Sequence, residues 1–370
     1  MKYYIIAGEA SGDLHASNLI HELKKLDSKA SFRCWGGDLM EKQGVHIVKH
    51  YRDLAFMGFL EVIVNIRTIF KNIQFCKVDL LKHKPDVLIL VDYPGFNLRI
   101  ADFAHQHKIK VVYYISPQIW AWKKSRVLKI KRNVDKMLVI LPFEKKFYRQ
   151  FDYEVDFVGH PLLDAITNAE SFKADFRARN SLTDKKIIAL LPGSRKQEIS
   201  IMLPLMLEAA ESFENYQIII AGAPSISDTF YKQFQFGKAI LIQNQTYEIL
   251  QHSQAALVTS GTATLETALF EVPEVVCYKG NSLSYQIAKQ LIKVKYISLV
   301  NLIMDRVVVK ELIQNELHLN SLKSELELLL SNEEYRNGMI KQFQKLKEML
   351  GGTGASQRAA ISIVNSAKSN

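Results

Sequence analysis

Apolar residues occur along the chain in short continuous runs, separated by longer stretches whose apolar positions recur at helical spacing. The short runs predict buried parallel strands, since a strand covered on both faces needs no polar side. They lie at residues 3–7, 31–35, 86–91, 111–115, 137–141, 155–158, 187–191, 216–221, 239–242, 255–258 and 275–278. The alternation predicts an α/β fold of two doubly wound, Rossmann-like sheets that face each other across a cleft.

The 370 residues exceed what one hydrophobic core usually holds, and the pattern divides accordingly. A polar crossover follows residue 161, so we expect an N-terminal domain at residues 1–165 and a C-terminal domain at residues 166–350. Several glycines interrupt the helical pattern before a last helix within residues 351–370. That helix either packs back on the first domain or exchanges with a second chain in a homodimer, and the sequence does not choose.

Composition narrows the class of protein. The three cysteines are widely spaced and form no CxxC pair, so we expect neither a disulfide framework nor a zinc site, as suits a reducing cytoplasm. No apolar run approaches the roughly 20 residues of a membrane-spanning helix. The protein is therefore expected to be soluble or peripheral.

The net charge of +10 is concentrated in residues 123–149, which hold ten Lys and Arg residues against Asp135 and Glu144. Such a segment favours a polyanionic partner, namely nucleic acid, an anionic membrane or a phosphorylated substrate. A solvated basic helix explains it equally well.

Residues 57–73 are apolar on nearly every side of the helix that they predict. A buried helix is the favoured interpretation. The alternative is a helix with one side exposed to lipid acyl chains.

In the first half, the turn at residues 8–13 (GEASGD) follows the first strand, where open α/β sheets place ligands. It is not a GxGxxG loop, and Glu9 and Asp13 make it acidic, so sugar hydroxyls suit it better than a dinucleotide. Ser11 and Gly12 belong to the same turn.

Asp92 ends the apolar run at residues 86–91, which places a carboxylate at the ligand edge of the sheet. A helix cap for residues 97–107 is the alternative. Trp120 and Trp122 either pack in the core or stack on sugar faces, and core packing is favoured for at least one of them. His160 precedes a proline at a turn, so a conformational role is favoured over proton transfer.

The second half holds two strand–glycine loop–helix units of the kind that binds phosphate. The first loop contains Gly193, Ser194 and Arg195, although an ordinary turn with a solvated arginine is the alternative. The second loop offers hydroxyls and a carboxylate, and its residues are Ser260, Gly261, Thr262, Thr264 and Glu266. We expect the Glu266 carboxylate in the first helical turn, where it accepts hydrogen bonds from a ribose diol or interacts with the helix dipole. The chain has no D-x-D, no P-loop and no HxE…CxxC motif, which counts against a metal or zinc site.

Nine motifs occur in the order found in one family: GEASGD (8–13), MGFLEV (57–62), VDYPGFN (91–97), SPQIWAW (116–122), LPFE (141–144), FVGHP (157–161), LLPGSR (190–195), SGTATLE (260–266) and SLVNLI (298–303). By these the chain resembles the lipid A disaccharide synthases of Gram-negative bacteria, which are GT-B glycosyltransferases. The resemblance implies that UDP-2,3-diacylglucosamine is joined to 2,3-diacylglucosamine 1-phosphate (lipid X), releasing UDP and inverting the anomeric centre.

The resemblance also implies the site residues. Asp92 matches the proposed base, Arg195 an essential arginine, and Asn301 an asparagine tied to activity; Glu266 matches the glutamate of the SGTAxLE motif. Gly95 departs from the family, because many relatives carry Asp there. The acceptor-side residues implied are Glu9, Ser11, Gly12, Met57, Glu61, Gln118 and Trp120.

By the same resemblance we expect no cofactor and a cytoplasmic enzyme that is peripheral to the inner membrane, with residues 123–149 facing anionic lipid. The nearest alternative is another GT-B enzyme acting on a UDP-sugar, such as a UDP-N-acetylglucosamine 2-epimerase. A nucleic-acid-binding protein is a further alternative, but no RNP, KH or helix-turn-helix signature supports it.

Overall fold

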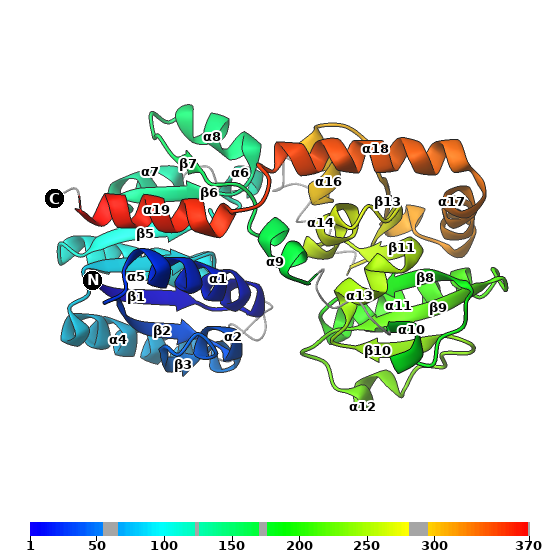
Figure 1. The fold of residues 1–370 in the computed structure, drawn as a ribbon, viewed down its shortest axis with the longest axis horizontal. Helices are drawn as coiled ribbons and strands as arrows, with labels where there is room; N and C mark the ends of the chain where they lie inside the picture. Colours follow the sequence, from blue (N-terminus) through cyan, green and yellow to red (C-terminus); the bar gives the residue numbers. More distant parts are fainter. Residues whose placement is uncertain (55–65, 123–125, 170–175, 281–294, 369–370) are drawn as a thin grey trace. The chain divides into compact units, whose positions relative to one another are not determined.

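The computed structural model describes residues 1–54, 66–122, 126–169, 176–280 and 295–368 (Figure 1). The chain divides into two compact units. Unit 1 consists of Met1–Asp164 together with Leu350–Asn370, and unit 2 of Ala165–Met349.

Unit 1 is built on a seven-stranded sheet in the order β3-β2-β1-β4-β5-β6-β7, with every adjacent pair of strands parallel. The strands are β1 (Lys2–Ala7), β2 (Ser31–Gly36), β3 (His46–His50), β4 (Val87–Val91), β5 (Lys110–Tyr114), β6 (Lys136–Val139) and β7 (Asp156–Phe157). The central strands β1 and β4 are apolar and buried along almost their whole length, as their unbroken hydrophobic runs predict.

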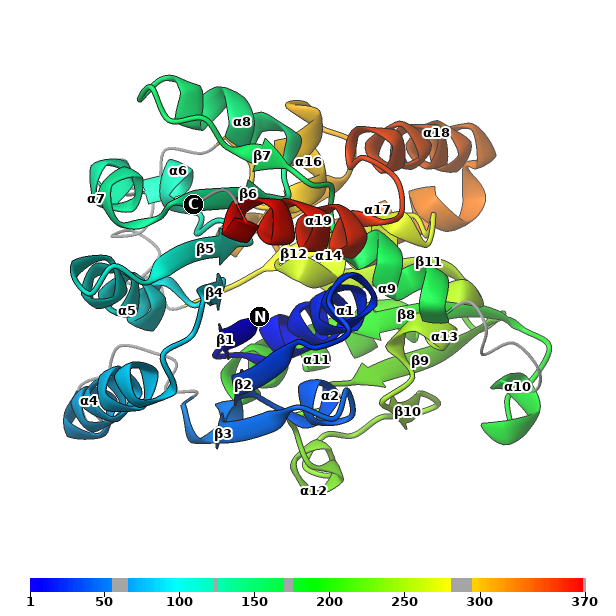
Figure 2. The ribbon, with the colours of Figure 1, turned by 60° about the vertical axis from the view of Figure 1, so that its left-hand side comes forward.

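Helices cover both faces of this sheet. One face packs on α4, α5 and α7, which share a core with alternate residues of the strands. On the other face α1 and α19 lie side by side, as both views show (Figures 1 and 2). The helices of unit 1 are α1 (Ala10–Leu26), α2 (Asp38–Glu41), η1 (Tyr51–Asp53), α4 (Ile66–His83), α5 (Pro94–Gln106), α6 (Ile119–Trp122), α7 (Arg126–Asn133), α8 (Pro142–Arg149), α9 (Leu162–Ala169, which continues into unit 2) and α19 (Ala355–Lys368).

The C-terminal helix α19 is fastened to unit 1 at its start. The carboxylate of Asp164 accepts hydrogen bonds from the backbone N–H groups of Gly354 at 2.6 Å and Ser356 at 2.9 Å. The backbone N–H of His160 donates to the Leu350 carbonyl at 3.0 Å. The bond from Ser356 satisfies one of the N–H groups that a helix start leaves without an intrahelical partner.

Unit 2 repeats the plan with a six-stranded parallel sheet in the order β10-β9-β8-β11-β12-β13. Its strands are β8 (Lys186–Leu191), β9 (Tyr216–Gly222), β10 (Ile240–Gln243), β11 (Ser253–Thr259), β12 (Glu274–Tyr278) and β13 (Lys310–Ile313). Its helices are α10 (Phe176–Arg179), α11 (Lys196–Ala210), α12 (Asp228–Tyr231), α13 (Thr246–Gln251), α14 (Thr262–Leu269), α16 (Leu299–Met304), η2 (Gln314–Glu316), α17 (Leu319–Ser331) and α18 (Glu333–Met349). Two parallel sheets with alternating helices confirm the predicted doubly wound α/β fold.

Two strands were not predicted from the hydrophobic pattern. β3 and β13 each form one edge of their sheet, and both are short and only partly buried. An edge strand pairs on one side only, so it does not need the continuous apolar run by which the central strands were found. The predicted helix at residues 57–73 lies partly outside the described residues; from Ile66 the chain is helical, and α4 continues to His83.

Candidate active site

In each unit, the loops that were predicted to bind ligand follow two neighbouring strands at the point where the strand order reverses. In unit 1, β1 and β4 are adjacent, and they lead into the turn with Glu9 and into Asp92. In unit 2, β8 and β11 are adjacent, and they lead into the loops with Arg195 and Ser260. The carboxyl ends of strands at such a switch point are where open α/β sheets bind ligands. The topology therefore brings the predicted residues together in pairs within each unit.

Asp92 is held in an unusual backbone conformation. Both Asp92 (φ 45°) and Tyr93 (φ 47°) are left-handed, which costs a non-glycine residue of the order of 1 kcal/mol. The main-chain oxygen of Asp92 accepts hydrogen bonds from the Tyr113 hydroxyl at 2.5 Å and from Asn97 Nδ2 at 2.7 Å. Because these donors are fixed in the core, they hold the turn against relaxation. The N-terminal cap of α5 is Tyr93, so Asp92 is not the helix cap that the alternative interpretation required.

The carboxyl group of Asp92 has a pKa close to neutral pH. Burial raises its pKa from 3.8 to about 7, and the nearby charge of Glu9 adds to the rise, while a backbone hydrogen bond from Tyr93 opposes it. Glu9 is the N-cap of α1 and is separated from β1 by Gly8 alone. A carboxyl group with a pKa near the working pH suits proton transfer. Gly95, three residues along, is exposed, and a side chain added there would meet no heavy atom within 4 Å.

The acidic turn after β1 is only partly available to a ligand. The carboxylate of Asp13 is buried and accepts the backbone N–H groups of Gly37 (2.7 Å), Leu39 (3.0 Å) and Met40 (3.2 Å), so it holds the start of α2. Gly8 is required here, because an added Cβ would come within 2.3 Å of the Tyr93 ring. Of the two acids in the turn, Asp13 therefore has a structural role.

The other acceptor-side residues differ in their exposure. Ser11 and Gln118 are exposed, whereas Gly12 is buried. The absence of a side chain at Gly12 lets α1 approach β1, because a Cβ added there would lie 3.3 Å from the Cβ of Ala7. Met57 and Glu61 lie outside the described residues, and the side chain of Trp122 is likewise not described.

Trp120 is half-buried at the edge of the core. Its ring packs edge-on against Phe143, and its indole Nε1 donates to Glu144 Oε1 at 3.3 Å. Glu144 also accepts the backbone N–H groups of Ile140 and Leu141, and burial raises its pKa to about 7. Trp120 thus has the core contacts that the sequence favoured for one of the tryptophans.

His160 is buried in unit 1, where its Nδ1 accepts the backbone N–H of Leu162 at 3.3 Å. Burial lowers its pKa to about 3, with a further contribution from His15. The imidazole is therefore neutral across the physiological range. This agrees with the conformational role and not with proton transfer.

The first loop of unit 2 has the backbone that close approach of an anion requires. Gly193 has φ 113°, and an added Cβ would lie 2.8 Å from Glu198 Oε2. Glu198, in the first turn of α11, accepts the Ser194 backbone N–H at 3.3 Å and pairs with Arg195 Nη1 at 3.0 Å. A carboxylate of the chain itself thus interacts with the loop N–H and the guanidinium, two groups suited to an anion. Sequence reasoning missed Glu198, although its i+3 spacing from Arg195 was a signal.

The second loop is open at its tip and closed at its base. Gly261 (φ 158°) and Thr262 are exposed, and nothing lies within 4 Å of a Cβ added at Gly261. Thr264 is fully buried, and its hydroxyl donates to the Gly261 carbonyl at 2.9 Å. The Ser260 hydroxyl donates to the Ile297 carbonyl at 3.2 Å. Gly261 and Thr262 are therefore the members of this loop most available to a ligand.

Glu266 was predicted to lie in the first turn of α14. This was wrong, because it is the fifth residue of the helix and therefore lies in the second turn. Its Oε1 accepts the Tyr247 hydroxyl at 3.1 Å, and burial raises the pKa of its carboxyl group. Since the carboxylate lies beyond the first turn, interaction with the helix dipole contributes little to its role.

Asn301 is buried, and its amide is fully used within unit 2. Nδ2 donates to the Val309 carbonyl and to Glu311 Oε1, both at 2.9 Å. Oδ1 accepts the backbone N–H groups of Val308 at 2.7 Å and Val309 at 3.0 Å. The arrangement leaves no amide hydrogen for a substrate. In this structure the side chain of Asn301 instead fixes the backbone at Val308 and Val309 and binds the Glu311 carboxylate.

Part of the positive charge of the basic segment at residues 123–149 is paired with acids from elsewhere in unit 1. Within the described residues 126–149, ion pairs join Lys129 and Arg132 to Asp102 (3.7 and 3.4 Å), Lys136 to Asp156 (2.6 Å) and Arg149 to Glu154 (3.5 Å). Lys145 and Lys146 are exposed on α8. The segment therefore presents a weaker positive field than its residue count suggests.

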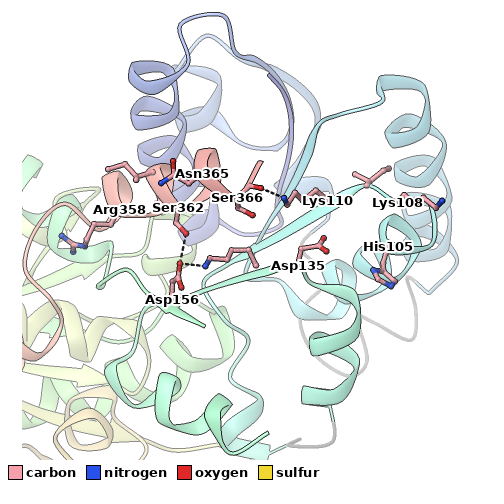
Figure 3. Close-up of a pocket in the computed structure, with 12 residues that line it drawn as sticks. His105, Lys108, Lys110, Asp135, Asp156, Arg358, Ser362, Asn365 and Ser366 are labelled. Carbon is pink, nitrogen blue, oxygen red and sulfur yellow. Dashed lines mark hydrogen bonds and ion pairs between the residues drawn. The ribbon is translucent and has the colours of Figure 1, made fainter. Parts of the chain in front are cut away.

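A pocket of about 930 Å³ lies at the opposite edge of the unit 1 sheet, between the amino ends of β5 to β7 and α19 (Figure 3). Its polar groups bind one another: Asp156 pairs with Lys136 and accepts the Ser362 hydroxyl at 2.9 Å, and Lys110 donates to the Ser366 carbonyl. None of the predicted site residues lines it. The pocket is part of the packing of α19.

Two kinds of feature are absent from the described part of the chain. No group of three or more His, Cys, Asp or Glu side chains there is arranged to hold a metal ion. No helix in the same ranges is both long and apolar enough to cross a membrane.

Comparison with known proteins decides the family. A model of the lipid-A-disaccharide synthetase family matches residues 3–363. The chain belongs to this family. Lipid-A-disaccharide synthases are similar to it over nearly their full length: that of Syntrophus aciditrophicus is 40% identical (96% of this chain, 95% of the relative), and that of Coxiella burnetii is 38% identical (98% and 97%). A member of the lipid-A-disaccharide synthetase family is a glycosyltransferase, and the predicted family and enzyme class are confirmed.

Solved structures share the fold of this family member. A UDP-GlcNAc 2-epimerase from Neisseria meningitidis bound to UDP-GlcNAc superimposes with a TM-score of 0.67 at 14% identity, covering 99% of this chain and all of that one. The glycotransferase of kitacinnamycin gives a TM-score of 0.66 at 13% identity, covering 99% and 98%. At such low identity the likeness shows the fold alone, which is that of GT-B enzymes.

Proposed function

We propose that this chain transfers a 2,3-diacylglucosamine unit from UDP to the 6-hydroxyl of 2,3-diacylglucosamine 1-phosphate, giving a β-1′,6-linked disaccharide 1-phosphate and UDP. Family membership supports the overall reaction. The observation that carries the mechanism is the carboxyl group of Asp92, held at a topological switch point with a pKa near 7.

Asp92 is the general base of the proposed reaction. As the acceptor 6-oxygen attacks C1 of the donor, its proton passes to the Asp92 carboxylate. The bond from C1 to the diphosphate oxygen breaks, and UDP leaves with the electron pair. Attack opposite the leaving group inverts the anomeric centre. One carboxylate suffices, because a diphosphate whose charge is stabilised leaves without protonation, unlike the leaving groups of paired-carboxylate hydrolases.

Unit 2 is proposed to bind the donor. Arg195 and the backbone at Gly193 and Ser194 stabilise the departing diphosphate, as does the start of α14 at Gly261 and Thr262. The diphosphate then takes the place that Glu198 holds on the loop in this structure. Glu266, steadied by Tyr247, accepts the ribose hydroxyls. No divalent metal has a part in this mechanism.

Unit 1 is proposed to bind the acceptor, with Glu9, Ser11 and Gln118 near its sugar. The surface of α4 supports the proposal of contact with lipid. Several large apolar side chains are exposed on this helix, namely Ile66, Phe70, Phe75, Val78 and Leu81. An amphipathic helix of this kind lies in a membrane interface, with lysines toward the phosphates. We therefore propose that the enzyme works at the cytoplasmic side of the inner membrane, with α4 as its main contact and the exposed lysines of α8 as a supplement.

Release of UDP tests the proposal. With UDP-2,3-diacylglucosamine and lipid X, the wild-type protein should form UDP and disaccharide 1-phosphate in equal amounts. Asp92→Asn should lower turnover by at least about 100-fold while donor and acceptor still bind. Near-wild-type turnover of that variant would remove Asp92 from the role of base.

The same assay separates the alternative of a UDP-sugar 2-epimerase. An epimerase acts on the UDP-sugar alone, so its product would appear without lipid X. Strict dependence of UDP release on lipid X supports the transferase, and epimerised UDP-sugar in the absence of acceptor would contradict it.

A further inference from the structure

Glu311 lies on β13, opposite Val276 of β12, and its carboxylate meets three hydrogen-bond donors. Oε2 accepts the backbone N–H of Ile297 at 3.1 Å. Oε1 accepts the backbone N–H of Ser298 at 3.0 Å and Nδ2 of Asn301 at 2.9 Å. One side chain thus organises the whole turn that leads into α16.

The three partners require a carboxylate at this position. All three are donors, so only a group that accepts on both oxygens satisfies them together. A glutamine would direct its NH₂ group at Ile297, or at both Ser298 and Asn301, and one or two donors would lose their bonds. Hydrogen bonds to a charged acceptor are also roughly twice as strong as neutral ones.

The turn held by Glu311 is connected to the second glycine loop. The peptide groups of Ile297 are fixed on both sides, since its N–H is bound by Glu311 and its carbonyl accepts the Ser260 hydroxyl at 3.2 Å. The Ser298 hydroxyl caps α16 by accepting the backbone N–H of Asn301 at 3.2 Å. The Ser260 backbone N–H in turn donates to the Cys277 carbonyl at 2.9 Å. Glu311 therefore acts on the Ser260 loop through a single intervening residue.

We propose that Glu311 is a positioning residue of the donor site, which sets the Ser260–Thr262 loop for the donor diphosphate through Ile297. Asn301 works with it as the second anchor of the same turn, so its contribution to activity passes through backbone geometry and not through contact with the substrate. The inference rests on the proposed donor site in unit 2.

Binding of UDP and steady-state kinetics test the inference on Glu311→Gln. We expect the dissociation constant of UDP and the KM for the donor to rise about tenfold, the effect of one to two lost charged hydrogen bonds. The KM for lipid X should stay within twofold of wild type, because the acceptor is assigned to unit 1. Glu316→Gln serves as the matched control, since Glu316 is an exposed glutamate just beyond the same strand.

A double-mutant cycle with Ser260→Ala distinguishes positioning from general destabilisation. If Glu311 acts through the contact between Ile297 and Ser260, the double variant should bind UDP about as weakly as the weaker single variant. Fully additive losses would overturn the inference, and so would a folded Glu311→Gln protein that binds UDP within twofold of wild type. Should Glu311→Gln show no cooperative unfolding, Glu311→Asp replaces it, and the same criteria apply.

The experiment separates this inference from the proposed function. A wild-type protein that does not bind UDP would contradict the donor site itself. A wild type that binds UDP, with unchanged affinity in Glu311→Gln, would contradict only the role of Glu311.

Discussion

The hydroxyl of Tyr113, on β5, donates a hydrogen bond to the main-chain oxygen of Asp92 at 2.5 Å, although Asp92 lies 21 positions earlier, just after the adjacent strand β4. Tyr113 is fully buried on β5, and Asn97 supplies the second bond to the same oxygen. Together they stabilise two consecutive left-handed residues, and this conformation fixes where the Asp92 carboxylate points.

Tyr113→Phe tests this constraint. The substitution keeps the buried ring and leaves the Asp92 carbonyl with Asn97 alone, so we expect about 1 kcal/mol less stability and a roughly five- to tenfold lower kcat. The KM for the donor should not change, because unit 2 is untouched. Tyr153→Phe is the control, since Tyr153 donates to the Val134 carbonyl in the same unit. An unchanged kcat would mean that Asn97 alone suffices.

The pH dependence of kcat/KM reports on Asp92. Its pKa is raised to about 7, so the base form appears as the pH rises through that value, and activity should rise with it to a plateau. Glu9→Gln removes the charge that contributes to this rise, so the pKa should fall and the profile should shift to lower pH. The exposed Glu41 offers a control substitution. A profile that does not move would mean that Glu9 does not act electrostatically on the base.

Arg195→Ala should impair use of the donor. Without the guanidinium, the departing diphosphate loses a charged partner, and kcat/KM for the donor is expected to fall by more than about tenfold. The KM for lipid X should remain unchanged. Lys341→Ala removes an exposed cation from α18 of the same unit and should have no effect. A neutral result for Arg195→Ala would place the phosphate site elsewhere.

Glu274→Gln should stabilise the protein at neutral pH. Glu274 is fully buried, neither carboxyl oxygen has a hydrogen-bond partner in the described structure, and burial raises its pKa well above the ordinary 4.5. A carboxyl group whose pKa is raised in the folded state contributes most stability below its unfolded pKa, and this contribution is lost as the pH rises above about 4.5.

Glutamine does not titrate, so the variant should be more stable by about 1–2 kcal/mol at pH 7, or a few degrees in Tm, with little difference at pH 4. Thermal unfolding at both pH values measures the effect. Glu316→Gln, on the surface, should change nothing at either pH. Equal Tm values for wild type and Glu274→Gln at pH 7 would contradict the raised pKa of this buried side chain.

Binding to vesicles tests the membrane contact. The full-length protein should sediment with vesicles rich in anionic lipid, more weakly at high salt because the lysines are screened. Replacing Phe70 and Val78 of α4 by serine should reduce binding, whereas Leu328→Ser, at another exposed apolar position on α17, should not. Binding that is indifferent to anionic lipid, or to the α4 substitutions, would exclude this surface.

The order of the central elements was predictable because it depends on local sequence. The strands β1, β4, β8 and β11 are continuous apolar runs, and a glycine-containing loop or turn follows three of them. Once such strands are known to be parallel, the switch point and the loops that lie there follow from topology. Asp92 and Arg195 could therefore be proposed as site residues from the sequence alone.

The partners of the polar side chains depend on residues far away in the sequence. Asp13 looked like a ligand group, and the fold directs it to the start of α2. The cations at 129 and 132 belong to the segment expected to face a polyanion, and the fold places both beside Asp102. Asn301 and Glu311 carry no local sign that they hold each other.

The sequence by itself therefore determined the class of fold, the family and the loops at the ligand edges, since apolar runs and glycine positions act locally. Only the tertiary structure decided which polar groups remain available to a substrate and which support the backbone. A side chain's hydrogen bonds depend on what the fold brings within about 3 Å of it, and the edge strands β3 and β13 likewise depend on a neighbouring strand for their pairing.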